Sequence, residues 1–135
     1  MVALTKDRNT VRRDGVQFND PVAGATRIFA GSIVCLNAAG NAVPGSPSAT
    51  LKARGVAQEQ VDNRDGAAGA LRIETRRGVF PFANSASADE ITRADIGADA
   101  YIVDDQTVAK TSATNTRSVA GVIRDVDSNG VWVEI

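Results

Sequence analysis

The sequence contains no histidine and a single cysteine among its 135 residues. The absence of histidine excludes the commonest general base, the Ser-His and Cys-His nucleophile pairs, and most zinc sites. One cysteine cannot form an intramolecular disulfide, so the cysteine usage does not indicate an oxidising compartment. Cys35 lies in an apolar run, Ile33 to Leu36, and we expect a small buried hydrophobic residue rather than a reactive thiol.

Aromatic residues, net charge and long apolar runs are also scarce. With four Phe, one Tyr and one Trp, the core must consist mainly of Val, Ile, Leu and Ala. A net charge of −1 gives no whole-molecule field that would attract nucleic acid or anionic lipid. The longest apolar run, around residues 28–40, is too short to span a bilayer, and the charged N-terminus does not resemble a signal peptide. We therefore expect a soluble protein made in the cytoplasm, with no membrane partner.

Motifs for catalysis and for cofactors are missing. The segment "DGAAGAL" lacks the Lys-Ser/Thr of a phosphate-binding loop, and Asp104-Asp105 is typical of a turn rather than a catalytic dyad. Two arginine pairs, Arg12-Arg13 and Arg76-Arg77, lack the interleaved aromatics of a nucleic-acid surface, whereas such pairs suit carboxylates at protein interfaces. We predict a protein that is not an enzyme, has no cofactor and binds no nucleic acid.

The segment "DVDSNG" matches the first half of an EF-hand calcium loop. Asp125, Asp127, Asn129 and Gly130 occupy positions 1, 3, 5 and 6 of that loop. Its bidentate glutamate would stand at residue 136, past the last residue of the sequence, and the flanks "VAGVIR" and "VWVEI" are rich in β-branched residues rather than helical. We expect a β-hairpin turn here and no metal site.

The register of this hairpin depends on the length of its loop. A three-residue loop at 128–130 would place Arg124 opposite Glu134 and Val126 opposite Trp132. A two-residue Asn-Gly loop would oppose the like charges of Asp125 and Glu134. We predict the three-residue register.

From residue 25 onward, the sequence alternates short strands and turns. The expected strands lie in "SIVCLN", "AVPG", "RGVAQEQV", "ALRIETRRGVFPF", "AYIVDDQTVAK" and "SVAGVIRDVDSNGVWVEI". The alternation of Leu71, Ile73 and Thr75 with charged residues indicates a strand with one buried face. The only helix expected is about one turn in "SADEITRADIG", capped by Ser87 or Asp89 and ended at Gly97. The predicted fold class is all-β, with at most one short helix.

A weak internal repeat accompanies these strands. Gly31 and Gly97 are 66 residues apart, as are Gly55-Val56 and Gly121-Val122. Two similar units of short antiparallel strands, packed together, would form a small β-barrel or sandwich. Because Gly and Val are common in this chain, coincidence is the alternative explanation.

Residues 1–24 differ from residues 25–135, which we predict to be the β-barrel or sandwich domain. Their few apolar residues follow no sustained period of 2 or 3.6, and the segment closes at Asp20-Pro21. We predict an extended N-terminal arm that becomes ordered on a partner surface, the alternative being a frayed terminus without a role.

Several ordered segments give the chain a recognisable likeness. "LTKDRNT", "AGSIVCLNAAGNAVPG", "VDNRDGAAGAL", "RRGVFPFANS", "ITRADIGADAYIVDDQTVAKT" and "SVAGVIRDVDSNGVWVEI" resemble the small capsid decoration (minor head, or cement) proteins of Mu-like tailed bacteriophages and prophages. The resemblance extends over nearly the whole chain. It implies a virion protein on the capsid exterior, commonly a homotrimer, that binds the major capsid protein and stabilises the shell at capsomer junctions.

This resemblance gives the predicted arm a partner. We expect the arm to bind the major capsid protein, since an unpaired segment can add a strand to an exposed sheet edge. The capsid-binding residues that we single out are Thr5, Lys6, Arg8, Arg12, Arg13 and Phe18. Another structural virion part, such as a head-fibre base or a tail or baseplate protein, is the alternative. A carbohydrate-binding or hydrolytic β domain is a third possibility, which the scarcity of aromatics disfavours.

Overall fold

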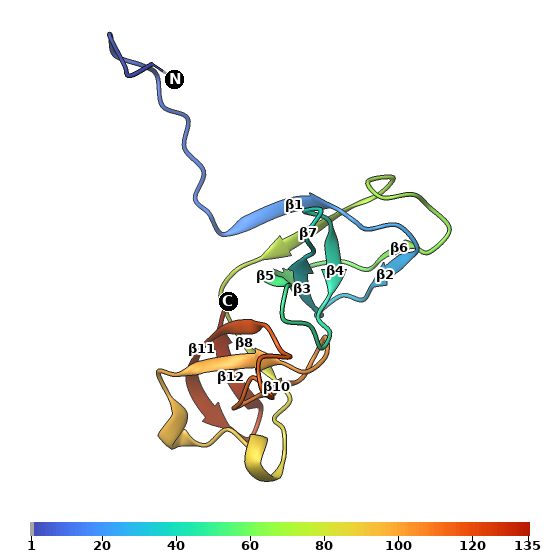
Figure 1. Ribbon diagram of the computed structural model, residues 1–135, viewed down its shortest axis with the longest axis vertical. Helices are drawn as coiled ribbons and strands as arrows, with labels where there is room; N and C mark the ends of the chain where they lie inside the picture. The colour runs from blue at the N-terminus through green and yellow to red at the C-terminus, as the bar shows by residue number, and fades with distance from the viewer. Residues whose placement is uncertain (1) are drawn as a thin grey trace.

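The computed structural model describes residues 2–135 as an all-β protein with an extended N-terminal segment (Figure 1). The first sheet has the spatial order β1 (Gln17–Pro21), β7 (Arg72–Arg76), β5 (Lys52–Ala57), β3 (Ile33–Leu36), β4 (Ala42–Pro44). The second sheet has the order β8 (Val79–Phe82), β12 (Gly130–Glu134), β11 (Val119–Asp127), β9 (Asp99–Ile102), β10 (Val108–Ala109). A small sheet pairs β2 (Thr26–Ile28) with β6 (Val61–Asn63). The ladders are antiparallel and the sheets are open, so the fold is a small sandwich rather than a closed barrel.

The two five-stranded sheets repeat one topology. Reading each sheet from its first strand, β1, β7, β5, β3 and β4 correspond to β8, β12, β11, β9 and β10. The register agrees as well: Ile33 pairs with Val56 in the first sheet, and Asp99 pairs with Val122, each 66 residues later, in the second. The bulges also correspond, at Arg54 in β5 and at Ala120 in β11. The repeat seen in the sequence therefore reflects two copies of one β unit.

The repeated glycines have a steric cause. A Cβ on Gly55 would lie 2.7 Å from the Arg76 carbonyl oxygen, and a Cβ on Gly121 would overlap the Glu134 carbonyl oxygen, which occupies the equivalent place. Each glycine thus lets its strand approach the neighbouring strand closely. This shared requirement explains why the Gly-Val pair recurs in the sequence.

Two apolar clusters hold the sheets together. Val34, Ala42, Ala57 and Ile73 lie on one face of the first sheet and pack with Val22, Ile28 and Val61 beside the small sheet. Ile33, Cys35 and Val56 lie on the opposite face and pack against the inner face of the second sheet, which contributes Ala100, Ile102, Val108, Ile123, Val131 and Val133. Burial of each such Val or Ile stabilises the fold by roughly 1.5–3 kcal/mol. The first sheet is therefore the middle layer of the molecule.

The closing hairpin differs from the predicted register. Asp127 pairs with Gly130 across a two-residue Ser128-Asn129 turn, and Asp125 rather than Val126 stands opposite Trp132. A bulge at Arg124 then shifts the register by one residue. The prediction of a three-residue loop was wrong because Gly130, which it placed in the loop, already pairs with Asp127 as the first residue of β12. The bulge still brings Arg124 Nε to 2.6 Å from Glu134 Oε2, so the expected ion pair forms.

The segment predicted to be helical and the N-terminal segment both differ from their predictions. In place of one α-helical turn there are two separate 3₁₀ turns, Ser87–Asp89 and Arg93–Asp95, and Gly97 follows them with a positive φ. Within the segment 1–24, residues 2–16 precede the first strand, whereas Gln17–Pro21 forms β1 at the edge of the first sheet.

Candidate functional site

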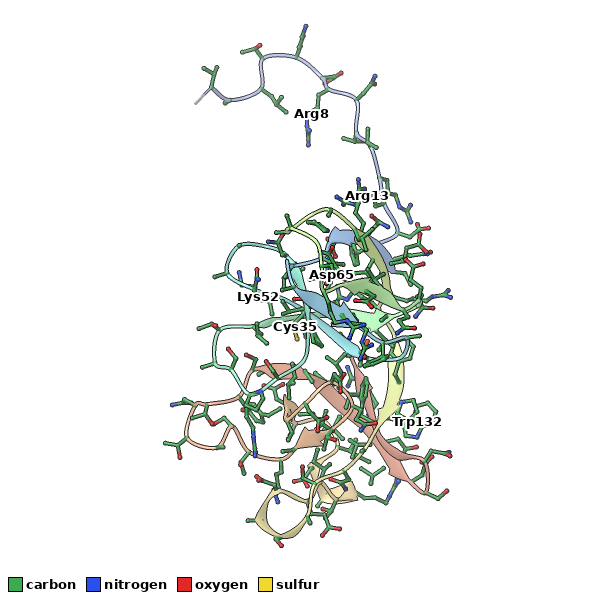
Figure 2. The ribbon with its side chains drawn as sticks, turned by 90° about the vertical axis from the view of Figure 1, so that its right-hand side faces the viewer. Arg8, Arg13, Cys35, Lys52, Asp65 and Trp132 are labelled. Carbon is green, nitrogen blue, oxygen red and sulfur yellow. The ribbon has the colours of Figure 1, made fainter. Side chains whose placement is uncertain are left out.

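The N-terminal segment 2–16, which we call the arm, extends away from the sheets (Figure 1). Its large apolar side chains are open to solvent: Val2 is 88%, Leu4 72% and Val11 97% exposed. Figure 2 shows Arg8 far from the sheets and Arg13 where the arm approaches them. Exposed apolar side chains gain no burial energy in this position, so they are free to be buried by a contact with another surface.

The six predicted capsid-binding residues fall into three places. Thr5, Lys6 and Arg8 lie in the outer arm and line a shallow concavity formed by the arm itself. Arg12 and Arg13 lie at its root, beside Gln17. Phe18 is not part of the arm, because it is half-buried in β1 opposite Thr75.

Phe18 belongs to a cluster that fixes β1 to the body. Arg54 donates two hydrogen bonds to Asp20, from Nε to Oδ2 at 2.7 Å and from Nη2 to Oδ1 at 3.1 Å. The same guanidinium stacks 3.7 Å above the centroid of the Phe18 ring. Bidentate ion pairs and cation–π stacking are among the stronger contacts that an arginine side chain makes, so Arg54 holds β1 against β5. Arg54 is the bulge residue of β5, and no local sequence signal links it to a carboxylate 34 residues away.

The backbone also fixes the root of the arm. Arg77 N–H donates to the Val16 carbonyl at 2.7 Å, and Arg76 stands opposite Gln17 in the β1–β7 ladder. The two arginine pairs noted in the sequence therefore meet at one place. Arg12, Arg13 and Arg76 line a single hollow there. The sequence showed both pairs but contained no signal that they would be neighbours.

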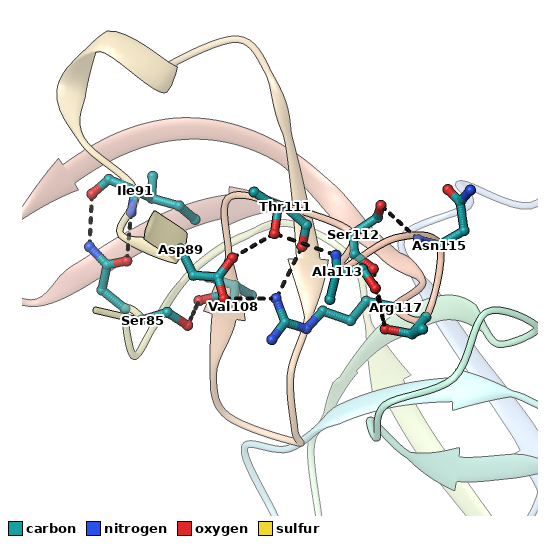
Figure 3. Close-up of polar contacts among 11 residues, drawn as sticks. Ser85, Asp89, Ile91, Val108, Thr111, Ser112, Ala113, Asn115 and Arg117 are labelled. Carbon is teal, nitrogen blue, oxygen red and sulfur yellow. Dashed lines mark hydrogen bonds and ion pairs between the residues drawn. The ribbon is translucent and has the colours of Figure 1, made fainter. Parts of the chain in front are cut away.

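A second polar region lies in the loop at residues 110–118 (Figure 3). Thr111 Oγ1 donates to Asp89 at 2.5 Å, and Arg117 Nη1 lies 3.2 Å from the other carboxylate oxygen. These contacts lower the pKa of Asp89, the Thr111 hydrogen bond more than Arg117. Ala113, Thr114 and Asn115 all have left-handed backbone angles. The network shapes the loop.

The groups that might have served catalysis or metal binding have other partners. The carboxylate of Asp127 accepts the Asn129 N–H at 2.8 Å, as in a turn, and Asp125 bonds to Arg93 at 2.7 Å. Within residues 2–135, no three His, Cys, Asp or Glu side chains form a group that could hold a metal ion. Cys35 is fully buried, as the sequence indicated, and burial raises the pKa of its thiol to about 12. A thiol in that setting is not a nucleophile near neutral pH.

The arm and its root are therefore the candidate functional site, as an exposed surface that a partner could contact. In the part of the chain that the structure describes, no helix is long and apolar enough to cross a bilayer. Comparisons of the chain with protein-family models, with curated proteins and with solved structures found no match.

Proposed function

We propose that this protein is a non-enzymatic decoration protein of a tailed-phage virion. It would bind the outside of the capsid through the major capsid protein and stabilise the shell at capsomer junctions, which is the role that its sequence resemblance implies. The observation that carries the proposal is the exposed arm attached to an edge strand of a compact β body. Synthesis in the host cytoplasm and assembly as a homotrimer belong to the same proposal.

In this proposal, the arm makes the contact with the capsid and the β body holds the arm in place. The arm has apolar side chains and backbone groups without internal partners, and both can be satisfied on another protein's sheet edge. The body supplies an ordered anchor, since the Arg54–Asp20–Phe18 cluster fixes the strand to which the arm is attached. Many symmetric copies on one shell make modest individual contacts collectively strong.

Deletion of residues 2–14 tests the role of the arm. This deletion spares β1 and all residues of the two apolar clusters, so the melting temperature of the body should not change. Sedimentation with expanded empty capsids should show that the full chain binds and that the shortened chain does not. Undiminished binding of the shortened chain would contradict the proposal that the arm attaches the protein.

The alternative is a different structural position in the virion, such as a head-fibre base or a tail or baseplate component. Nothing in the arm or its root distinguishes these positions. Gold-labelled antibody against the body, applied to intact virions, separates them: label on the head supports decoration, and label on the tail overturns it.

A further inference from the structure

The root of the arm forms a hollow of about 590 Å³ that gathers positive charge. We call it the arginine hollow, and its lining includes Arg12, Arg13, Asp14, Val16, Gln17 and Arg76. Its position follows from the ladder, because Gln17 pairs with Arg76 and the arm continues from β1 past that pair. Figure 2 shows Arg13 where the arm approaches the body.

The charges in the hollow are not balanced within the chain. Arg12 Nη2 lies 3.8 Å from Asp14 Oδ1 with both side chains almost fully exposed, and a pair of that kind contributes little. Among residues 2–135, Arg13 and Arg76 form no ion pair. Three guanidinium groups and one carboxylate line the hollow, and a second carboxylate, that of Glu74, accepts a hydrogen bond from Gln17 Nε2 at 3.3 Å. Positive charge is still in excess and is available to a partner.

The second β unit provides an internal comparison. Glu134 stands where Arg76 stands in the first unit, since Val56 pairs with Arg76 and the equivalent Val122 pairs with Glu134. Glu134 is neutralised by Arg124 at 2.6 Å. The same backbone position is therefore charge-balanced in one unit and unbalanced in the other, so the surplus charge is specific to the arm root.

An open strand edge adjoins the hollow. The Val16 carbonyl and the Val22 N–H bond to residues of the β7 side, so Gln17 and Asn19 direct their backbone groups away from β7. The Asn19 carbonyl accepts from Arg72 Nη2 at 2.7 Å, whereas no group among residues 2–135 hydrogen-bonds to the outward backbone groups of Gln17. In the second unit, Pro81 of β8 occupies the place of Asn19 and removes the outward donor. The outward edge of β1 therefore keeps the Asn19 donor, which the equivalent edge of β8 lacks.

We propose that the arginine hollow and the adjoining edge of β1 bind an extended acidic segment of a partner protein. Carboxylates of the segment would accept paired hydrogen bonds from the guanidinium groups, and its backbone would pair with Gln17. The hollow has no aromatic lining on which bases could stack, which disfavours single-stranded nucleic acid. The structure argues for an acidic, extended partner segment, and only the identity of the partner as a capsid protein rests on the proposed function.

The test is an NMR titration of the isotope-labelled full chain with a short peptide of alternating Asp and Val. The amide signals of Arg13, Gln17 and Arg76 should shift, and added salt should weaken the effect. A peptide of alternating Asn and Val should leave these signals in place. The double variant Arg13→Gln/Arg76→Gln should bind the acidic peptide at least about tenfold more weakly, because both unpaired charges are lost.

A matched variant separates local charge from net charge. Arg64→Gln/Arg93→Gln removes two exposed arginines that are paired with Asp62 and Asp125, away from the hollow, and should keep the affinity within about twofold. Absence of shifts, an equal response to the Asn peptide, an equal loss in the matched variant, or tighter binding of oligothymidylate of similar length would each overturn the proposal. Because the titration contains no capsids, its failure is distinguishable from failure of the capsid-binding experiment.

Discussion

Position 130 makes two demands on its residue that only glycine satisfies together. Its φ is 121°, in the region that side chains rarely adopt, and a Cβ at this position would overlap the carbonyl oxygen of Phe82 in β8. The sequence predicted the first requirement from the Asn-Gly pair. It did not predict the second, because contact with β8 depends on the order of strands in the sheet.

Replacement of this glycine should be costly. Gly130→Val should lower the free energy of unfolding by about 2–4 kcal/mol, through backbone strain and the displacement of β8. Urea denaturation followed by circular dichroism measures the change. Gly40→Ala is the matched control, since Gly40 also has a positive φ of 81° but open space around it, and it should cost only about 1 kcal/mol. Equal losses in both variants would show that the Phe82 contact does not matter.

At the scale of elements, the strands with clear patterns were predictable and their partners were not. The alternation around Ile73 and Thr75 identified β7, and both residues are buried, although Leu71 is exposed because it lies before the first residue of the strand. β1 was missed, since its pairing partner lies more than fifty residues away and its own residues show no period. The hairpin register was mispredicted from the turn onward, and the bulge at Arg124 was missed because a bulge leaves no mark in the apolar pattern.

The loop at residues 110–118 contains strain that a substitution can relieve. Thr114 is exposed and β-branched, yet its φ is 59°. Thr114→Asn should raise the free energy of unfolding by about 0.5–1 kcal/mol, because asparagine tolerates the left-handed region better. Chemical denaturation measures the gain, and Thr10→Asn in the arm should leave stability unchanged. A loss of stability in Thr114→Asn would mean that the threonine side chain has a contact worth more than the strain.

At the scale of the whole molecule, we expect the two β units to unfold together, because they share a core. Ile33 of the first unit is fully buried in the cluster that contains Val131 and Val133 of the second. Trp132, the single tryptophan, lies between those two valines in β12 and reports on the second unit. Shared burial of this kind favours one cooperative transition.

Because the two units share a core, a substitution in the first unit should affect the unfolding of the second. Ile33→Ala should destabilise the protein by about 2–5 kcal/mol, the usual cost of such a cavity, and should shift the Trp132 fluorescence transition by the same amount as circular dichroism. A tryptophan transition that stays in place while circular dichroism shifts would show that the units unfold separately.

The dependence of stability on pH is also a property of the whole chain. Hydrogen bonds from Arg64 lower the pKa of Asp62 to about 2. The pKa of Asp89 is lowered most strongly by the hydrogen bond from Thr111. Backbone hydrogen bonds are the largest cause for two others, from Thr92 for the pKa of Asp95 and from Val126 for the pKa of Asp125. A lowered folded pKa contributes stability that is present above the unfolded pKa and is lost as pH falls through the folded one.

The melting temperature should therefore fall as pH decreases from about 4 to about 2. It should stay nearly constant between about pH 6 and 8, because the chain has no histidine to titrate there. Calorimetry across this range checks both statements, and a transition near pH 6 would contradict the second.

The candidate site was predictable only in its linear part. The arm is visible in the sequence because it lacks any period, but the segment predicted as the arm, 1–24, includes β1, and residues 2–16 alone precede the sheets. The arginine hollow was not predictable, since it joins Arg12 and Arg13 to Arg76 through a ladder between strands that are distant in sequence.

The hydrogen bonds of Arg77 and Gly78 have a practical consequence for protein engineering. Arg77 N–H bonds to Val16 at the arm root, while Ile135 N–H donates to the Gly78 carbonyl at 3.0 Å and the Ile135 carbonyl accepts from Arg77 Nε at 3.3 Å. A fluorophore attached after Ile135 would thus report on events at the arm root. A bulky fusion at that point would obstruct it, and the exposed loop around Asp65 is the better place for cargo.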